Sequence, residues 1–161
     1  MGYTSMFDES LIFLDVEGEE LKELFEEIAK RLQQQGFVNE QYLEGLLARE
    51  QAFPTGLITQ YLNIGLPHSE PAYVEKPFIA IVRLKNEVKM KQMGDSQEMQ
   101  VKDLFFLGIK EPKEQVGLLQ SLMALFMDEG FVKAFIETQE VQAIYQLVTQ
   151  YTKYNFWRNL R

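Results

Sequence analysis

The only histidine of the chain, His68, is the side chain best suited to nucleophilic chemistry near neutral pH. It follows the apolar residues 64–66 and has prolines close by at Pro67 and Pro71. Neutral imidazole is a nucleophile at this pH because its ordinary pKa is ~6.5, and histidine can form covalent intermediates. A single histidine is also often a half-buried structural or surface residue. Its sequence surroundings therefore have to decide between the two roles.

Three common kinds of site are excluded by residue type or spacing. A zinc site needs three or four ligands from histidine, cysteine or clustered carboxylates, and the chain has one histidine and no cysteine. No Gly-x-Ser-x-Gly segment indicates a serine nucleophile, and no glycine-rich or Walker-type loop indicates a nucleotide phosphate site. We therefore expect no metal and no cofactor. The chemistry that remains is attack of His68 on a phosphoryl group.

The segment upstream of His68 offers groups that suit this chemistry. Phosphoryl transfer depends mainly on positioning and on neutralising charge. The Arg49 guanidinium matches phosphate oxygens through forked hydrogen bonds, and Thr55 and the backbone N–H groups near Gly56 can donate further ones. In a purely structural interpretation, Arg49 pairs with a carboxylate at a helix end and Thr55 only shapes a turn. The residues by themselves leave both interpretations open.

Composition indicates a single globular domain. The chain has 161 residues, 46% hydrophobic and 25% charged, which is enough to bury a substantial core. A net charge of −8 disfavours binding to nucleic acid or to an anionic membrane. No apolar run approaches the ~20 residues that cross a bilayer, and the N-terminus lacks a secretory signal pattern. Because cysteine is absent as well, we expect a cytoplasmic protein, with residues 1–150 as the domain and 151–161 as a C-terminal tail.

Strand and helix patterns alternate along the chain, which predicts an α/β fold with a small sheet between helical layers. Three near-continuous apolar runs predict buried strands, at residues 10–16, 78–84 and 104–109. The polar residues 85–102, which contain Met93-Gly94-Asp95-Ser96, predict a long excursion with a turn. Residues 57–59 and 63–66 fit either short strands or an extended loop around the histidine.

Apolar residues at helical spacing predict the helices. They are expected at residues 19–35, 39–49 and 112–126, in a short piece with Phe131 and Phe135, and in a last helix that carries Val141 to Val148. Gly36 is expected to end the first helix, and Pro112 to open the third. Asn39 and Thr138 are expected to be the N-caps of the second and last helices.

Three segments around the histidine carry a family resemblance. They are Arg49-Glu50, Pro54-Thr55-Gly56-Leu57 and Ile64-Gly65-Leu66-Pro67-His68. Together they resemble the type 2 EIIA domains of the bacterial phosphoenolpyruvate-dependent sugar phosphotransferase system, which include fructose-, mannitol-, nitrogen- and galactitol-type members. The resemblance extends from about residue 11 to residue 150. Segments that are similar to the galactitol branch in particular are His68-Ser69-Glu70-Pro71, Leu84-Lys85-Asn86, Met93-Gly94, Ile109-Lys110-Glu111-Pro112 and residues 118–123.

The resemblance implies a mixed β-sheet flanked by helices and a phosphotransferase function that uses neither metal nor nucleotide. The histidine matching His68 accepts a phosphoryl group from the phosphocarrier protein HPr and passes it to a cognate EIIB, which phosphorylates sugar delivered by the membrane-embedded EIIC. The arginine matching Arg49 lies close to that histidine. The galactitol-like segments favour a role in transport of galactitol or a related carbohydrate. Regulation by phosphorylation-dependent protein binding, as in nitrogen-type members, stays open.

The chain departs from the family at one position near the expected site. Many members carry a second histidine at the start of the helix after the last central strand, whereas the corresponding segment here is Pro112-Lys113-Glu114-Gln115-Val116. The best counterpart is Gln115, which can donate a hydrogen bond to a phosphate oxygen but cannot take a proton or carry positive charge. The resemblance thus suggests Gln115 as a phosphate-binding residue, with helix capping as the alternative, and leaves His68 as the phosphoryl acceptor.

Overall fold

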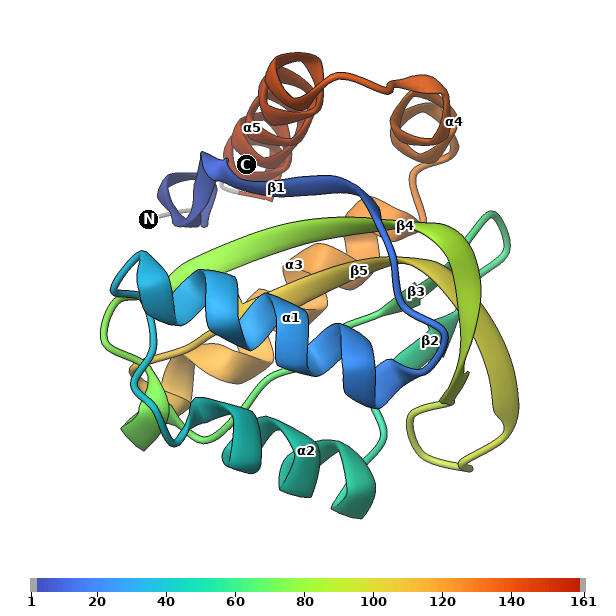
Figure 1. Ribbon diagram of the computed structural model, residues 1–161. Helices are drawn as coiled ribbons and strands as arrows, with labels where there is room; N and C mark the ends of the chain where they lie inside the picture. Colours follow the sequence, from blue (N-terminus) through green and yellow to red (C-terminus); the bar gives the residue numbers. More distant parts are fainter. Residues whose placement is uncertain (1–2, 160–161) are drawn as a thin grey trace.

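The computed structural model describes residues 3–159, with side chains described through residue 153. In this part of the chain, five strands form one mixed sheet in the order β1-β4-β5-β3-β2, and helices cover both of its faces (Figure 1). The strands are β1 (Phe7–Val16), β2 (Gly56–Ile58), β3 (Asn63–Gly65), β4 (Phe78–Lys91) and β5 (Glu98–Gly108). The helices are α1 (Leu21–Gln34), α2 (Tyr42–Ala52), α3 (Gln115–Phe126), α4 (Glu129–Glu137) and α5 (Val141–Asn159). The predicted α/β architecture is confirmed.

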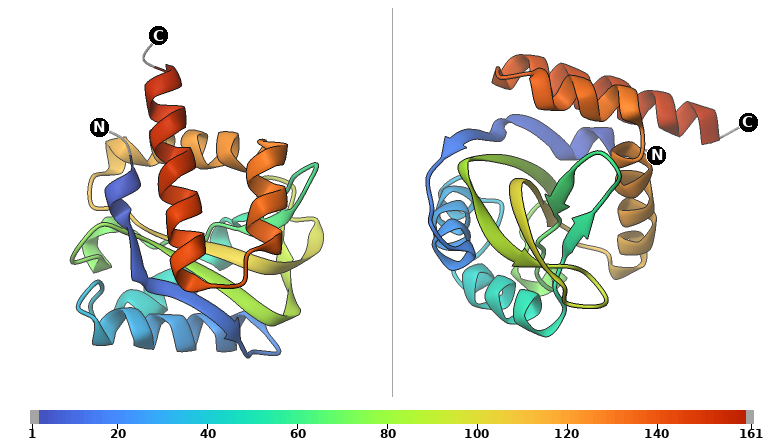
Figure 2. Two further views of the ribbon diagram at one scale, coloured as in Figure 1. Left: turned by 90° about the horizontal axis from the view of Figure 1, so that it is seen from above. Right: turned by 90° about the vertical axis from the view of Figure 1, so that its right-hand side faces the viewer.

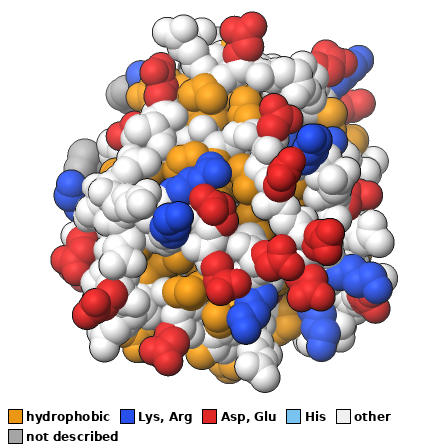
Figure 3. Space-filling view, viewed as in Figure 1, with side chains coloured by type: hydrophobic (Ala, Val, Ile, Leu, Met, Phe, Trp, Pro, Cys, Tyr) orange, Lys and Arg blue, Asp and Glu red, His pale blue; other side chains and the backbone are white. Residues whose placement is uncertain are grey.

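Two apolar cores lie on opposite faces of the sheet because successive strand residues point to opposite sides. In β4, Ala80 and Val82 pack in the core with α1 and α2, whereas Ile79 and Ile81 pack with α3, α4 and α5. Strands covered on both faces read as continuous apolar runs, which is why the central strands could be predicted. Figure 2 shows the two helical layers on either side of the sheet. The outer side of the layer formed by α1 and α2 carries many charged side chains (Figure 3).

The strands β4 and β5 form one long antiparallel hairpin, so most of residues 85–102 are strand and not the predicted loop, whereas the predicted turn at Met93-Gly94-Asp95-Ser96 is confirmed. Its arms stay paired from Val88 and Val101 to Lys91 and Glu98. The turn that joins them contains Gly94 in a left-handed conformation with φ of +89°. Alternate residues of the arms are exposed. Polar residues therefore occupy the solvent side of both arms, and this hid the strands in a search for apolar runs.

Two expected helix caps are also wrong. The Asn39 side chain accepts a hydrogen bond from the Gln41 backbone N–H at 2.9 Å, a local turn that precedes α2. The Thr138 hydroxyl donates to the Ala134 carbonyl at 2.6 Å and so belongs to the C-terminal end of α4, not to the start of α5. In both cases a short polar side chain satisfies a neighbouring backbone group instead of opening a helix. Gly36 ends α1 as expected, with φ of +81°.

A buried arginine ties α4 to the sheet. Arg83 in β4 pairs with Asp103, its neighbour on β5, at 2.8 Å from Nε to Oδ1, and both side chains are buried. Its two other nitrogens donate to the carbonyls of Thr138 at 2.6 Å and Phe135 at 2.7 Å. These carbonyls lie at the C-terminal end of α4, where backbone acceptors lack helical partners. Arg83 therefore satisfies both a strand carboxylate and a helix end.

The last helix, α5, continues without a break past residue 150, where the tail was expected to begin. The Tyr151 ring contacts the Phe131 ring edge to face, with 5.3 Å between centroids. The Thr152 hydroxyl lies 3.0 Å from that of Thr4. Residues 151 and 152 thus pack on the domain beside its N-terminal segment (Figure 2). Neither α5 nor another helix in the described residues is long and apolar enough to cross a membrane.

Tyr42 provides a test of the core beneath α2. Its side chain is fully buried, and its hydroxyl has no hydrogen-bond partner among the described residues. Burial raises the pKa of this phenol far above its usual 10.0. A buried unsatisfied polar group costs about 1–3 kcal/mol, so Tyr42→Phe should raise the free energy of unfolding by about 1 kcal/mol in urea denaturation. Tyr42→Leu, which removes the ring packed against Phe78, should lower it. A loss of stability in Tyr42→Phe would contradict this account.

Candidate functional site

The sheet fixes the backbone of His68. The histidine follows β3 at a point where the chain still runs beside β5, and the Pro67 carbonyl accepts the Leu107 N–H at 2.9 Å. His68 itself forms a parallel bridge with Leu107. Proline also restricts the residue before it to an extended conformation, which suits Leu66 here. Only 2% of the His68 surface is exposed, so the imidazole is held by its neighbours.

The hydrogen bonds of the imidazole define its tautomer. His68 Nδ1 lies 2.9 Å from the Leu66 carbonyl oxygen. A carbonyl can only accept, so Nδ1 carries the hydrogen and Nε2 keeps a free lone pair. The Gln115 side-chain nitrogen lies 3.5 Å from Nε2, and an amide N–H is a donor that suits this lone pair. The nitrogen available as a nucleophile is therefore Nε2.

Burial lowers the pKa of His68 below its usual 6.5. The hydrogen bond to Leu66 opposes this shift, and the positive charge of Arg49 adds to it. Both burial and a nearby cation disfavour the imidazolium form. At neutral pH the imidazole is thus uncharged, which is the form that can attack an electrophile.

The lowered pKa predicts a titration that is simple to follow, because the chain has one histidine. The imidazole proton resonances should titrate with a midpoint below 6.5. Between 6.5 and that midpoint the unfolded chain binds a proton that the folded chain does not, so stability should fall as pH falls through this window. Above 6.5 the group contributes no pH dependence. A midpoint at or above 6.5 would show that the site does not desolvate the imidazole.

Arg49 lies in the last turn of α2 and is held in place by Phe53. Its Nη1 donates to the Phe53 carbonyl at 2.7 Å, and its guanidinium carbon lies 5.0 Å from the centre of the Phe53 ring. Phe53 is 65% exposed, so the guanidinium stacked on its ring lies at the surface. No ion pair in the described residues involves Arg49. Its remaining donors can therefore be used by an anion.

Thr55 lies in the turn between α2 and β2, Gly56 is the first residue of β2, and both are buried. The backbone N–H and the hydroxyl of Thr55 both donate to the Glu50 carboxylate. A Cβ atom on Gly56 would lie 2.5 Å from the Met99 sulfur and 2.6 Å from the Lys91 carbonyl oxygen. The need for glycine here follows from this close approach to the β4–β5 hairpin. The structure therefore joins His68 directly to Gln115 and brings Arg49 near enough to affect its pKa, whereas Thr55 connects to it only through Leu66.

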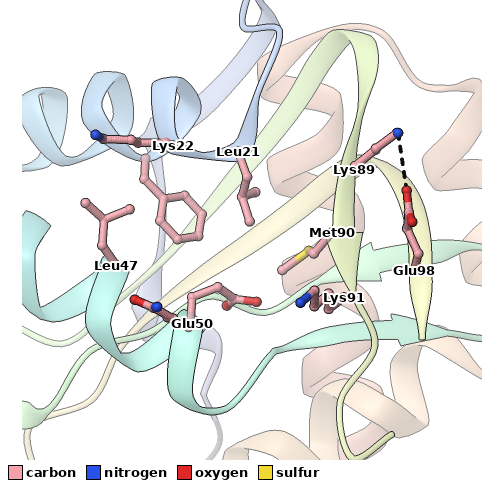
Figure 4. A pocket seen from close by; sticks show the side chains of 10 residues that line it. Leu21, Lys22, Leu47, Glu50, Lys89, Met90, Lys91 and Glu98 are labelled. Atoms are coloured by element: carbon pink, nitrogen blue, oxygen red, sulfur yellow. Dashed lines mark ion pairs between the residues drawn. The ribbon is translucent and has the colours of Figure 1, made fainter. Parts of the chain in front are cut away.

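A cavity of about 660 Å³ lies elsewhere, between α1, α2 and β4 (Figure 4). Leu21, Phe25, Leu47 and Met90 give it apolar walls, and His68 is not among its lining residues. Glu50 extends from α2 into this space toward Lys91 (Figure 4). In the sequence, Glu50 stood out only as part of the Arg49-Glu50 segment of the family resemblance. Its contact with Thr55 depends on how the turn after α2 folds, and no sequence pattern identifies it.

A family model confirms the resemblance in the sequence. Residues 5–151 match the model described as phosphoenolpyruvate-dependent sugar phosphotransferase system, EIIA 2. The galactitol-specific EIIA component of the phosphotransferase system of Escherichia coli K12 is 28% identical over 132 residues, which cover 82% of this chain and 85% of that protein.

Solved structures show the same fold. The nitrogen regulatory protein IIA-Ntr from Neisseria meningitidis aligns with a TM-score of 0.73 and 23% identity, covering 89% of this chain and 97% of the other. Enzyme IIA of the mannitol system of Escherichia coli, in its complex with phosphorylated enzyme IIB, aligns with a TM-score of 0.71 and 19% identity, covering 89% and 99%. Together with the family match over most of the chain, they leave one conclusion: this chain belongs to the type 2 EIIA family of the phosphoenolpyruvate-dependent sugar phosphotransferase system.

Proposed function

We propose that this protein is a cytoplasmic phosphocarrier that takes a phosphoryl group from HPr on His68 and passes it to a cognate EIIB for sugar uptake. The observation that carries the proposal is the geometry of His68 in a chain of this family. Its Nδ1–H is engaged by the Leu66 carbonyl at 2.9 Å, and its pKa is lowered. Nε2 is thereby left unprotonated and ready to attack phosphorus.

The transfer step needs little from the protein except position and charge. The lone pair of His68 Nε2 forms a bond to phosphorus while the phosphorus–nitrogen bond of the donor phosphohistidine breaks, and the donor imidazole leaves with the electron pair. The hydrogen stays on Nδ1 and keeps its hydrogen bond to the Leu66 carbonyl oxygen. Onward transfer to EIIB reverses these roles at His68. Since the transferred group is charged throughout, catalysis depends on neutralising its oxygens.

Gln115 and Arg49 are the side chains that we assign to those oxygens. Gln115 Nε2 lies 3.5 Å from the nucleophilic nitrogen, and it would turn from that nitrogen to a phosphoryl oxygen once the group has arrived. Arg49 offers a forked donor at the surface near His68. Thr55 and Gly56 would support the site through the backbone of Leu66. Transport of galactitol or a related carbohydrate is favoured by the similarity to the galactitol-specific component.

Phosphorylation with purified partners tests the proposal. Incubation of the full chain with phosphoenolpyruvate, enzyme I and HPr should produce an acid-labile phosphoryl adduct. His68→Ala should abolish labelling completely, because the variant contains no other histidine. Gln120→Ala, which changes an exposed glutamine of the same helix and keeps the acceptor, should be labelled like the wild type and so serves as the matched control. Equal labelling of wild type and His68→Ala would refute the proposal.

Transfer from the labelled protein to EIIB separates transport from regulation. We expect the label to move to a galactitol-type EIIB and then to sugar when membranes containing EIIC are added. A label that HPr installs but no EIIB removes would favour the regulatory role instead.

A further inference from the structure

Glu50, in the last turn of α2, accepts hydrogen bonds from Thr55 through both of its carboxylate oxygens. Oε2 accepts the Thr55 backbone N–H at 2.9 Å, and Oε1 accepts the Thr55 hydroxyl at 2.5 Å. Only 1% of the Thr55 surface is exposed. Hydrogen bonds to an ionised group are about twice as strong as neutral ones. Glu50 therefore sets the position of Thr55 at the start of β2.

Two further hydrogen bonds lead from Thr55 to the imidazole. The Thr55 carbonyl accepts the Leu66 N–H at 3.1 Å, and the Leu66 carbonyl accepts the His68 Nδ1–H at 2.9 Å. Leu66 is fully buried, so water does not compete with these bonds. Each bond fixes the position of the next backbone group in a low-dielectric interior, where hydrogen bonds are electrostatically stronger than in water. The result is a connected path from a carboxylate to the functional histidine.

We propose that Glu50 is a positioning residue for His68: through Thr55 and Leu66, it holds the carbonyl that keeps the hydrogen on Nδ1 and so leaves Nε2 as the reacting nitrogen. The inference rests on the proposed phosphoryl acceptance by His68 and adds a residue that controls which nitrogen reacts. Carboxylates commonly orient a functional imidazole by touching it. In this protein the carboxylate acts at a distance, through a threonine and the backbone.

A simpler role for Glu50 would be to close the turn between α2 and β2 without any effect on the imidazole. The two roles differ in what they change. Closing the turn affects the free energy of unfolding, whereas positioning affects the tautomer of His68 as well. The single histidine makes its nitrogen resonances directly observable.

The test combines histidine ¹⁵N resonances with the rate of phosphorylation by HPr in the full-length protein. In Glu50→Gln, one oxygen becomes an amide nitrogen that cannot accept from Thr55. Thr55→Val removes the hydroxyl but keeps the backbone bond, and Thr55→Ser keeps both donors and is the matched control. Loss of groups that orient a functional imidazole costs about 10- to 100-fold at metal centres. We expect slowing of about 100-fold in Glu50→Gln and about tenfold in Thr55→Val, on the same scale.

Both slowed variants should also show a population with the hydrogen on Nε2, whereas wild type and Thr55→Ser should show Nδ1–H alone. If Glu50→Gln does not fold, the tautomer of His68 in the near-isosteric Thr55→Val variant decides whether the proposal holds. An unchanged tautomer in the folded variants would overturn the proposal, whether or not the rate falls. The tautomer is read without any phosphoryl donor. Failure of phosphotransfer itself would instead appear as an unlabelled wild type.

Discussion

Replacing Arg49 with methionine should slow phosphorylation of His68 by HPr about 100- to 1,000-fold, which corresponds to 2.7–4 kcal/mol of transition-state stabilisation for one removed donor group. The reason is that the Arg49 guanidinium already lowers the pKa of His68 through its positive charge. The same charge would neutralise the transferring phosphoryl oxygens. Quench-flow or gel-based phosphorylation rates measure the effect directly.

Two further variants sharpen this result. Arg49→Lys keeps the charge but loses the forked donor, so its rate should fall between those of wild type and Arg49→Met. Arg31→Met removes an arginine from the last turn of α1, where it pairs with Glu27, and should leave the rate unchanged. Loss of the Arg49 charge should also raise the pKa of His68, because that charge lowers it in the wild type. A rate for Arg49→Met within threefold of wild type would remove Arg49 from the mechanism.

Replacing Arg83 with methionine should lower the free energy of unfolding by about 3–5 kcal/mol, as expected when one partner of a buried ion pair is removed. Three acceptors each lose a hydrogen bond from Arg83: the Asp103 carboxylate and the carbonyls of Phe135 and Thr138. Denaturant unfolding followed by circular dichroism measures the change. Because α4 loses its tie to the sheet, its amide hydrogens should exchange faster.

The β4–β5 hairpin contains a matched control for Arg83. Lys89 pairs with Glu98 across the same two strands at 3.3 Å, but both side chains are exposed. Lys89→Met should therefore cost less than about 1 kcal/mol. The double variant Arg83→Met, Asp103→Leu should recover part of the lost free energy of unfolding, since it removes the carboxylate left without an ion-pair partner. It should not recover all of it, because the Thr138 carbonyl still lacks the donor that Arg83 supplied. Equal effects of Arg83→Met and Lys89→Met would contradict the role given to burial.

The central strands and most helices followed from apolar patterning, because residues buried on both faces leave an unbroken signal. The outer half of the β4–β5 hairpin did not, since only one of its faces is covered and its solvent side carries residues such as Lys89. The predictions of helix N-caps at Asn39 and Thr138 were wrong for a different reason. Their side chains have several backbone partners within reach, and only the packed chain selects among them.

The candidate site, like the fold, could be predicted only in part from the sequence. The position of His68 beside a proline, and the choice of Gln115 as its neighbour, could be inferred from sequence. Its tautomer could not, because it depends on the local backbone conformation that brings the Leu66 carbonyl within 2.9 Å of Nδ1. Nor could the link from Glu50, which depends on how Thr55 and Leu66 pair.

The irregular first strand has a consequence for how the molecule behaves at high concentration. β1 lies at one edge of the sheet, its register with β4 shifts twice, and Asp15 within it adopts a left-handed conformation with φ of 53°. Asp8 and Glu9 add exposed acidic side chains to the same edge, while the opposite edge, β2, is only three residues long. Irregular, charged or short edges resist the strand-to-strand pairing that leads to aggregation. These features protect both edges of the sheet from pairing with a second copy of the chain.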